Sequence, residues 1–250
     1  MILLLYLFPW LFYQGLVSHQ AWDLLLKKHV SQDGSVNYAG FLRDRKELQD
    51  YLDRLSANPP EERWTRNETM AFWINAYNAF TVKLVLDHYP VHSIRYIRKG
   101  IPFINSVWDM PFIQIGGEKM DLNHIEHGIL RRQFREPRIH AAINSGSISC
   151  PVLRNEAFNP SRLGWQLDDA MRQFINDRQR NQLQGSTIRI SKIFSWFSND
   201  FRINGAPLTD YLNRYARIPV PRRTKVEYLP FDWRLNEMRP VRFISKKASR

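Results

Sequence analysis

The chain has 250 residues, of which 44% are hydrophobic, with eight tryptophans and fifteen phenylalanines. This length and apolar content predict an ordered globular protein with a sizeable core and exclude a disordered chain. One cysteine, Cys150, excludes an internal disulfide and any structural zinc site built on several thiolates.

The chain is strongly basic, with a formal net charge of +12. Such a charge is typical of proteins that bind nucleic acid, anionic membranes or acidic polymers. Here the Lys and Arg residues are spread along the sequence, and no helix-turn-helix, zinc-finger or RNA-binding signature accompanies them. We therefore expect a solvated basic surface and no nucleic-acid partner.

Residues 1–17 form an apolar run that Pro9 and Gly15 interrupt. The run is too short for a membrane span of about 20 residues, and it resembles the apolar part of a secretory signal peptide. It lacks a Lys/Arg-bearing leader and a small-x-small cleavage site. We expect residues 1–18 to be a signal peptide or an N-terminal membrane anchor, with a hydrophobic first helix as the alternative. The protein is then exported, to the periplasm or cell envelope.

The first half of the chain predicts helices over 21–29, 41–55 and 67–88. The third is long and has few polar positions, so it should be central and buried. Asn75 and Asn78 lie three residues apart within it and therefore share a face. Buried amides must be hydrogen-bonded, so this pair either fixes neighbouring backbone or lines a polar binding cleft.

The second half predicts short elements of both kinds. Residues 91–120 carry extended pieces with a Gly116-Gly117 hairpin signal, and they precede a helix over 121–134. Further strands are expected over 139–144, 188–191 and 225–229, further helices over 163–178 and 208–217, and a basic tail over 238–250. Residues 20–237 thus form a single α+β domain, with a long buried central helix packed on a mainly antiparallel sheet.

The helix expected over 121–134 carries a carboxylate among apolar residues. On a wheel of about 100° per residue, Glu126 falls inside the apolar stripe, His127 on its border and His124 on the solvent side. A buried Glu requires a partner, or its pKa rises until it is neutral. Glu126 and His127 are therefore the candidate site residues of this helix.

Cys150 follows a Gly/Ser-rich turn after the strand expected over 139–144. Alternation along that strand predicts that His140 and Asn144 face the same side. A thiol presented on a loop near imidazoles is typical of a nucleophile, although a small buried cysteine with no chemical role is the alternative. His140 is either a site residue or a hydrogen-bonded histidine beside the core.

A metal site is the competing chemistry for His124, Glu126, His127 and His140. The wheel separates His124 from Glu126 by about 160°, and the sequence has no HExxH motif. We therefore predict no metal site and no cofactor.

Five blocks occur together in order: residues 72–78 (FWINAYN), residues 122–131, Ser149-Cys-Pro151, residues 189–194 (RISKIF), and residues 228–233 (YLPFDW) with Asn236. In this combination the chain resembles the family called domain of unknown function 547 over roughly residues 20–237. That family has a suspected distant kinship to papain-like and transglutaminase-like cysteine folds, which would here require a permuted chain order because His127 precedes Cys150.

The resemblance implies Cys150 as nucleophile, His127 as base and Glu126 as the partner that orients the base. Asn144 or the backbone amides of 147–150 would stabilise an oxyanion. The chain departs from the family pattern at Ser145, where many relatives carry a second cysteine, and at His124, where relatives often have Asp.

We therefore expect an exported cysteine-dependent amide or peptide hydrolase, or acyl transferase, that acts on a small peptide-like substrate. Its catalytic residues would be Cys150, His127 and Glu126, and its binding residues Asn75, Asn78, His140, Asn144 and Ser145. The alternatives are a non-catalytic envelope domain that binds an anionic ligand or partner, and a His-based metal-binding protein.

Overall fold

The computed structural model describes residues 16–97 and 106–238. Most of the segment predicted to be a signal peptide or anchor, and all but residue 238 of the predicted basic tail, lie outside this part of the chain. Among the described residues, no helix combines the length and hydropathy needed to cross a membrane.

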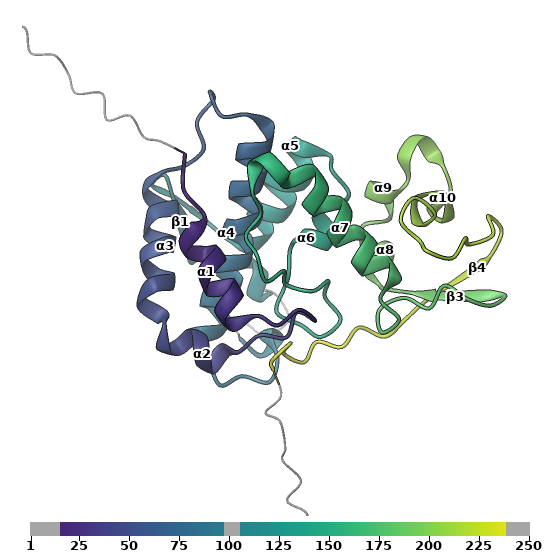
Figure 1. Ribbon diagram of the computed structural model, residues 1–250, viewed down its shortest axis with the longest axis horizontal. Coiled ribbons are helices and arrows are strands. Elements are labelled where there is room, and N and C mark those ends of the chain that lie inside the picture. Colours follow the sequence, from purple (N-terminus) through teal and green to yellow (C-terminus); the bar gives the residue numbers. More distant parts are fainter. Residues whose placement is uncertain (1–15, 98–105, 239–250) are drawn as a thin grey trace, which may run out of the picture.

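A helical body occupies one end of the molecule (Figure 1). Its first four helices are α1 (Gln20–His29), α2 (Tyr38–Arg43), α3 (Arg45–Ala57) and α4 (Arg66–Leu86). The single helix expected over 41–55 is two helices, because the chain turns at Asp44. The carboxylate of Asp44 contacts Lys28 and His29 of α1, each at 2.6 Å, which holds the turn against that helix.

The long buried helix is confirmed in α4. A capping box begins it, in which the side chains of Thr65 and Glu68 satisfy each other's backbone N–H groups. From Met70 to Val82 every side chain of α4 is buried. The helices that pack on it are α2, α3 and two shorter elements, η3 (His124–Arg131) and η4 (Pro160–Arg162). Its burial thus comes mainly from helix packing.

The strands form two small sheets of two strands each. Strands β1 (Ile113–Ile115) and β2 (Glu118–Met120) pair antiparallel. Gly116 and Gly117 join them with φ of +61° and +82°, as the hairpin signal predicted. Strands β3 (Thr187–Ile190) and β4 (Lys225–Tyr228) pair in parallel. The α+β class is confirmed.

The described residues contain two hydrophobic cores. The larger lies within the helical body, and the smaller gathers side chains of β3, α8 (Ile193–Trp196), α9 (Ser198–Phe201) and α10 (Leu208–Leu212) at the other end of the molecule (Figure 1). Helix α7 (Leu163–Asn176) connects the two ends. Its first turns bury Leu163 and Leu167 in the larger core, and its last turns bury Met171 and Phe174 in the smaller one.

The strand expected over 139–144 is wrong: this segment forms α6 (Ile139–Ala142), a single helical turn. A short apolar run does not distinguish strand from helix, and two consecutive alanines favour the helix. Ile139, Ala142 and Ile143 contact the larger core with helical spacing, whereas Ala141 contacts the smaller one. Helix α6 therefore lies between the two cores.

The helix expected over 121–134 is present but irregular, because η3 is a π-helix that continues into α5 (Arg132–Phe134). The wider turn of the π-helix changes the directions of the side chains around the helix axis only slightly. Glu126 is buried and His124 is exposed, as predicted. The remaining short elements are 3₁₀ turns, namely η1 (Ile94–Tyr96), η2 (Val107–Asp109) and η5 (Ile203–Gly205).

The two buried amides of α4 generate a prediction about stability. The side chain of Asn75 bonds both the N–H (3.0 Å) and the C=O (2.8 Å) of Phe158, deep in the core. Replacing Asn75 with Ala leaves both backbone groups unpaired, so it should lower the free energy of unfolding by at least about 2 kcal/mol. Urea unfolding followed by tryptophan fluorescence measures this loss. The exposed Asn199→Ala is the control, and equal stability of the two variants would contradict the assignment.

Candidate functional site

A cavity of about 170 Å³ lies at the boundary between the two cores. Its lining includes Cys150 and Ser145 from the loop after α6, Glu126 and His127 from η3, and His140 from α6. The cavity thus brings together the three residues predicted to be catalytic and two of those predicted to bind. The other three, Asn75, Asn78 and Asn144, are not part of this lining.

The sulfur of Cys150 contacts two hydroxyl groups. The Oγ atoms of Ser145 and Ser147 each lie 2.7 Å from the Sγ atom. Cys150 itself is buried, with 3% of its surface exposed, and Gly146 makes the tight turn before it with φ of +75°. Hydroxyl and thiol groups can both donate, so either atom of each pair can be the donor.

The backbone of the Cys150 loop is bonded to its neighbours. The N–H groups of Ile148 and Ser149 donate to the carbonyls of Arg234 and Asp232, and that of Cys150 donates to the carbonyl of Ser147. These three amides are therefore committed to structural hydrogen bonds. Of the amides of 147–150 that were expected to stabilise an oxyanion, those of 148–150 thus bond carbonyls in this structure.

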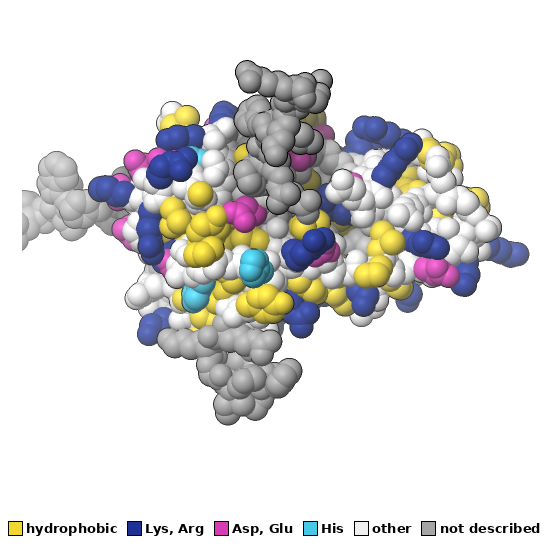
Figure 2. Space-filling view, turned by 90° about the horizontal axis from the view of Figure 1, so that it is seen from below, with side chains coloured by type: hydrophobic (Ala, Val, Ile, Leu, Met, Phe, Trp, Pro, Cys, Tyr) yellow, Lys and Arg dark blue, Asp and Glu magenta, His cyan; other side chains and the backbone are white. Residues whose placement is uncertain are grey.

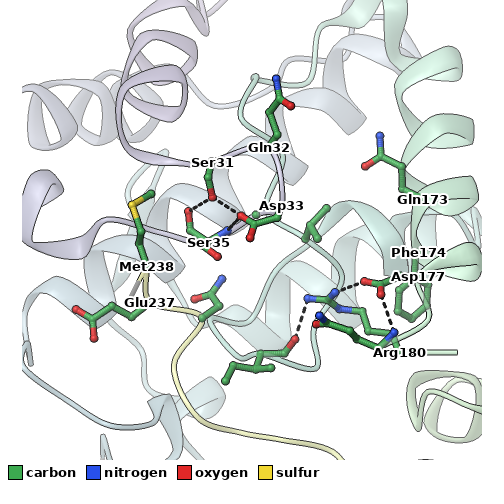
Figure 3. A pocket seen from close by; sticks show the side chains of 15 residues that line it. Ser31, Gln32, Asp33, Ser35, Gln173, Phe174, Asp177, Arg180, Glu237 and Met238 are labelled. Carbon is green, nitrogen blue, oxygen red and sulfur yellow. Dashed lines mark hydrogen bonds and ion pairs between the residues drawn. The ribbon is translucent and has the colours of Figure 1, made fainter. Parts of the chain in front are cut away.

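Arg180 holds the same loop through its backbone carbonyls, and Figure 3 shows this side chain beside Asp177. Its guanidinium donates to the carbonyls of Ile148 (2.8 Å) and Cys150 (2.5 Å), and it is paired with Asp177. These residues border a second, open cavity of about 1050 Å³. The position of the thiol thus depends on a partly buried charge, that of Arg180, as well as on the turn.

His140 is buried and oriented by a carboxylate. Its Nε2 atom lies 2.7 Å from Oδ2 of Asp200 in α9, and its ring stacks on Phe197 at 4.0 Å between centroids. Burial lowers the pKa of His140, against the opposing hydrogen bond and charge of Asp200. A neutral imidazole that donates Nε2–H to Asp200 keeps its lone pair on Nδ1. Nδ1 lies on the side of Glu126, 3.8 Å from Oε1.

Asp200 also binds Arg131 of η3 through two hydrogen bonds, of 2.6 and 3.0 Å. Burial opposes the charge on Asp200, but the hydrogen bonds from His140 and Arg131 outweigh it and hold the pKa of this carboxyl well below its usual range. Asp200 therefore stays ionised and acts as an acceptor for both partners.

The ring of His127 is bonded to the same guanidinium. Nη1 of Arg131 lies 3.1 Å from Nδ1 of His127. Because a guanidinium only donates, Nδ1 accepts and the ring proton lies on Nε2. Burial, followed by the charge of Arg131, lowers the pKa of His127. His127 is thus a neutral imidazole that carries its ring proton on Nε2.

Glu126 is the buried carboxyl of the cavity. The hydroxyl of Tyr77 lies 3.5 Å from its Oε2 atom. Burial raises the pKa of Glu126 to about 7, although the charge of Arg131 opposes the shift. Glu126 is therefore partly protonated at neutral pH, and its contact with an imidazole is to His140 and not to His127.

The three remaining amides bond backbone. Asn75 is bonded to Phe158, as described above. Asn78 binds the carbonyl of Ala142 (2.9 Å) and the N–H of Asn144 (2.8 Å). The side chain of Asn144 donates to the carbonyl of Pro151 (2.7 Å) and accepts from Gly146 (2.8 Å). One N–H of the Asn144 amide therefore binds the backbone in this structure, as do the amides of 148–150.

Sequence reasoning missed Asp200 and Arg131. Asp200 lies 60 residues from His140 in a short polar turn, and nothing in its local sequence marks it. Arg131 counted only as one of many dispersed basic residues, although it stands four positions after His127, where helical side chains meet. In the described part of the chain, no group of three or more His, Cys, Asp or Glu side chains is arranged to hold a metal ion.

Glu126 makes stability depend on pH. Its pKa is about 7 in the folded protein against an ordinary value of 4.5, so the unfolded chain loses this proton at a lower pH. Its contribution to stability is complete below pH 4.5 and is lost as the pH rises through 7, by on the order of 3 kcal/mol. Glu126→Gln should match the wild type at pH 4.5 and exceed it in stability at pH 8, as measured by urea unfolding. The exposed Glu118→Gln is the control, and an equal pH response in both variants would refute the assignment.

Arg180 generates a prediction for the thiol loop. Arg180→Ala removes charged donors from the carbonyls of Ile148 and Cys150 and should destabilise the protein by about 2–3 kcal/mol. Its exposed neighbour Arg178→Ala should change stability by less than about 0.5 kcal/mol. Thermal unfolding of both variants checks the difference, and similar melting temperatures would show that this contact does not hold the loop.

The comparisons with known proteins agree with the sequence pattern. No curated protein and no solved structure matches the chain. The family model described as protein of unknown function, DUF547, matches residues 61–175, a segment that runs from α4 through the Cys150 loop to α7. Residues 61–175, which carry Cys150, His127, Glu126 and His140, therefore belong to this family.

Proposed function

We propose that this protein is a cysteine-dependent hydrolase or acyl transferase of amide or peptide bonds. The observation that carries the proposal is the common cavity, in which Cys150 lies together with His140, an imidazole that Asp200 orients. A thiol, a base and a carboxylate that fixes the base are the parts of a nucleophilic acyl-transfer site. A small peptide-like amide is the proposed substrate.

His140 is the better candidate for the base than His127. His140 donates one ring N–H to Asp200 and keeps a lone pair on the other nitrogen, which is the tautomer that a general base requires. His127 accepts from Arg131 through its only unprotonated nitrogen. A proton taken up there would face a guanidinium at 3.1 Å. Glu126 likewise supports His140, since Oε1 lies 3.8 Å from its Nδ1.

The neutral His127 fits a different role. Its Nε2–H is a donor on a ring that lines the cavity, and Arg131 opposes its protonation. A neutral imidazole held in this form can donate a hydrogen bond to a developing oxyanion. His127 would act beside the donors that the resemblance implied, of which the amides of 148–150 and one N–H of Asn144 already bond carbonyls.

The reaction would proceed in two halves. The sulfur of Cys150 adds to the substrate carbonyl carbon while its proton passes to Nδ1 of His140, and the oxyanion accepts a bond from His127. The C–N bond then breaks, and the amine leaves with the proton from His140. Water, or an acceptor nucleophile in a transferase, attacks the thioester and gives its proton to His140, which returns a proton to the sulfur.

In this structure the hydrogen bonds of the Cys150 sulfur to described residues run to Ser145 and Ser147, not to His140. Catalytic hydrogen bonds are often long in a free enzyme and shorten when substrate binds. Ser145, which stands where many relatives carry cysteine, then serves as a hydroxyl donor to the nucleophile. We also retain export to the cell envelope as part of the proposal, on the apolar sequence of residues 1–17.

The two alternative functions, a non-catalytic domain that binds an anionic ligand or partner and a His-based metal-binding protein, have less support. Lys and Arg side chains are scattered over the face in Figure 2 and do not gather into one basic site for an anionic ligand. For the described residues, the metal hypothesis lacks a ligand cluster.

The test of the mechanism is alkylation of Cys150 by iodoacetamide between pH 5 and 9. His140→Gln should slow the reaction at pH 7 by at least about tenfold, because it removes the proton acceptor, whereas His127→Ala should change it much less. Thermal unfolding checks that each variant is folded. Slow alkylation at a rate that His140→Gln does not change would overturn the assignment of His140 as the base. So would a decrease in rate in His127→Ala instead of in His140→Gln.

Turnover is tested separately with acyl-peptide anilides and activated esters. The wild type should release the leaving group, and Cys150→Ala should not. Release at the same rate by the Ala variant would show that the thiol is not the nucleophile.

A further inference from the structure

One wall of the Cys150 cavity consists of aromatic rings. We call Trp108, Trp196, Phe231 and Trp233 the aromatic wall. Trp233 lies at its centre, with ring centroids 5.3 Å from Trp108, 5.7 Å from Trp196 and 4.4 Å from Phe231. All four residues line the cavity that contains the thiol. They come from three separate segments, namely η2, α8 and residues 231–233.

The aromatic wall remains accessible to a ligand. Trp196 is 47% exposed, although it is among the largest apolar side chains and the protein has two cores that could bury it. The other three members are only partly buried. Accessible aromatic faces beside a cavity are typical of a binding site, because burying them against a ligand is favourable.

The size of the cavity limits the ligand. An apolar cavity of about 150 Å³ in another protein binds one benzene molecule, and this one measures about 170 Å³. It therefore has room for a single ring, and because the cavity is open the remainder of the ligand would extend out of it. The carboxyl of Glu126 in the same lining disfavours an anion, and the guanidinium of Arg95, which lies 5.2 Å from the centre of the Trp233 ring, disfavours a cation. The fitting group is one neutral, flat, apolar ring.

We infer that the aromatic wall binds a single uncharged aromatic ring of the substrate, attached close to the carbonyl that Cys150 attacks. The inference rests on the proposed function, since the ring is held beside the reacting thiol. It narrows the substrate class to amides or peptides with an aromatic group next to the scissile bond. Offset or edge contacts with the indoles would select a flat ring over a puckered one of similar size.

The experiment uses three iodoacetamides that carry N-methyl, N-benzyl or N-cyclohexylmethyl groups. In each, the sulfur of Cys150 displaces iodide and forms a C–S bond. The rate with the protein is divided by the rate of the same reagent with free glutathione, which removes intrinsic reactivity. We expect this normalised rate to be about tenfold higher for the N-benzyl reagent than for the N-methyl reagent, and to saturate as the concentration of the N-benzyl reagent rises. It should also be higher for the N-benzyl reagent than for the N-cyclohexylmethyl reagent.

Trp196→Ala should reduce the benzyl-to-methyl ratio at least about fivefold, and Trp196→Phe should preserve most of it. Because Trp196 is half exposed, both variants are expected to fold. Trp165→Ala is the matched control: Trp165 is 56% exposed on α7 and is not part of the cavity lining.

Three results would overturn the inference: a benzyl-to-methyl ratio near one in the wild type, a benzyl-to-methyl ratio that Trp196→Ala does not change, or equal normalised rates with the benzyl and cyclohexylmethyl reagents. Failure of the proposed function has a different signature. It would appear as N-methyl alkylation that is slow and indifferent to His140, whatever the ratio between reagents.

Discussion

The ion pair between Asp200 and Arg131 is the interaction on which the site depends. Asp200 belongs to α9, beside the smaller core, and Arg131 to η3, beside the larger one. The pair therefore joins the two halves of the molecule at the cavity. A bidentate guanidinium–carboxylate contact fixes direction as well as distance. The ion pair also determines the tautomers of both imidazoles, because Asp200 accepts a hydrogen bond from His140 while Arg131 donates one to His127. One ion pair thus sets the tautomers of two rings that would otherwise be equivalent by sequence.

The sequence predicted secondary-structure elements and the burial of single side chains better than it predicted which side chains contact each other. The long run with few polar positions that forms α4 and the glycines of the β1–β2 hairpin are local signals, and both expectations are confirmed. The apolar position of Glu126 on its helix also predicted its burial. The contact of Glu126 with His140 and that of His140 with Asp200 both depend on tertiary packing, the second across 60 residues, and a single sequence holds no signal for either. This is why His127, adjacent to Glu126 in sequence, looked like its partner, whereas the contact in space is to His140.

The error at 139–144 has an instructive physical cause. Alternating apolar residues were interpreted as a strand, which predicted that His140 and Asn144 face the same side. As a helical turn between two cores, α6 buries apolar side chains in both directions and leaves His140 directed at Asp200. A buried histidine in such a position must be hydrogen-bonded, and a carboxylate is the partner that fixes its tautomer. The misassigned strand therefore concealed the base.

The distance in sequence between His140 and Cys150 has a further consequence. Both belong to a single segment of eleven residues, so their relative position depends on the joint between α6 and the thiol loop. Asn78 of α4 holds that joint, since its side chain binds the carbonyl of Ala142, the last residue of α6, and the N–H of Asn144, two residues further along the chain. An amide that satisfies both groups fixes the angle at which the chain leaves the helix. Asn78 thus acts on the site from within the core, through the backbone that carries the thiol and the imidazole, and without contributing to the cavity lining.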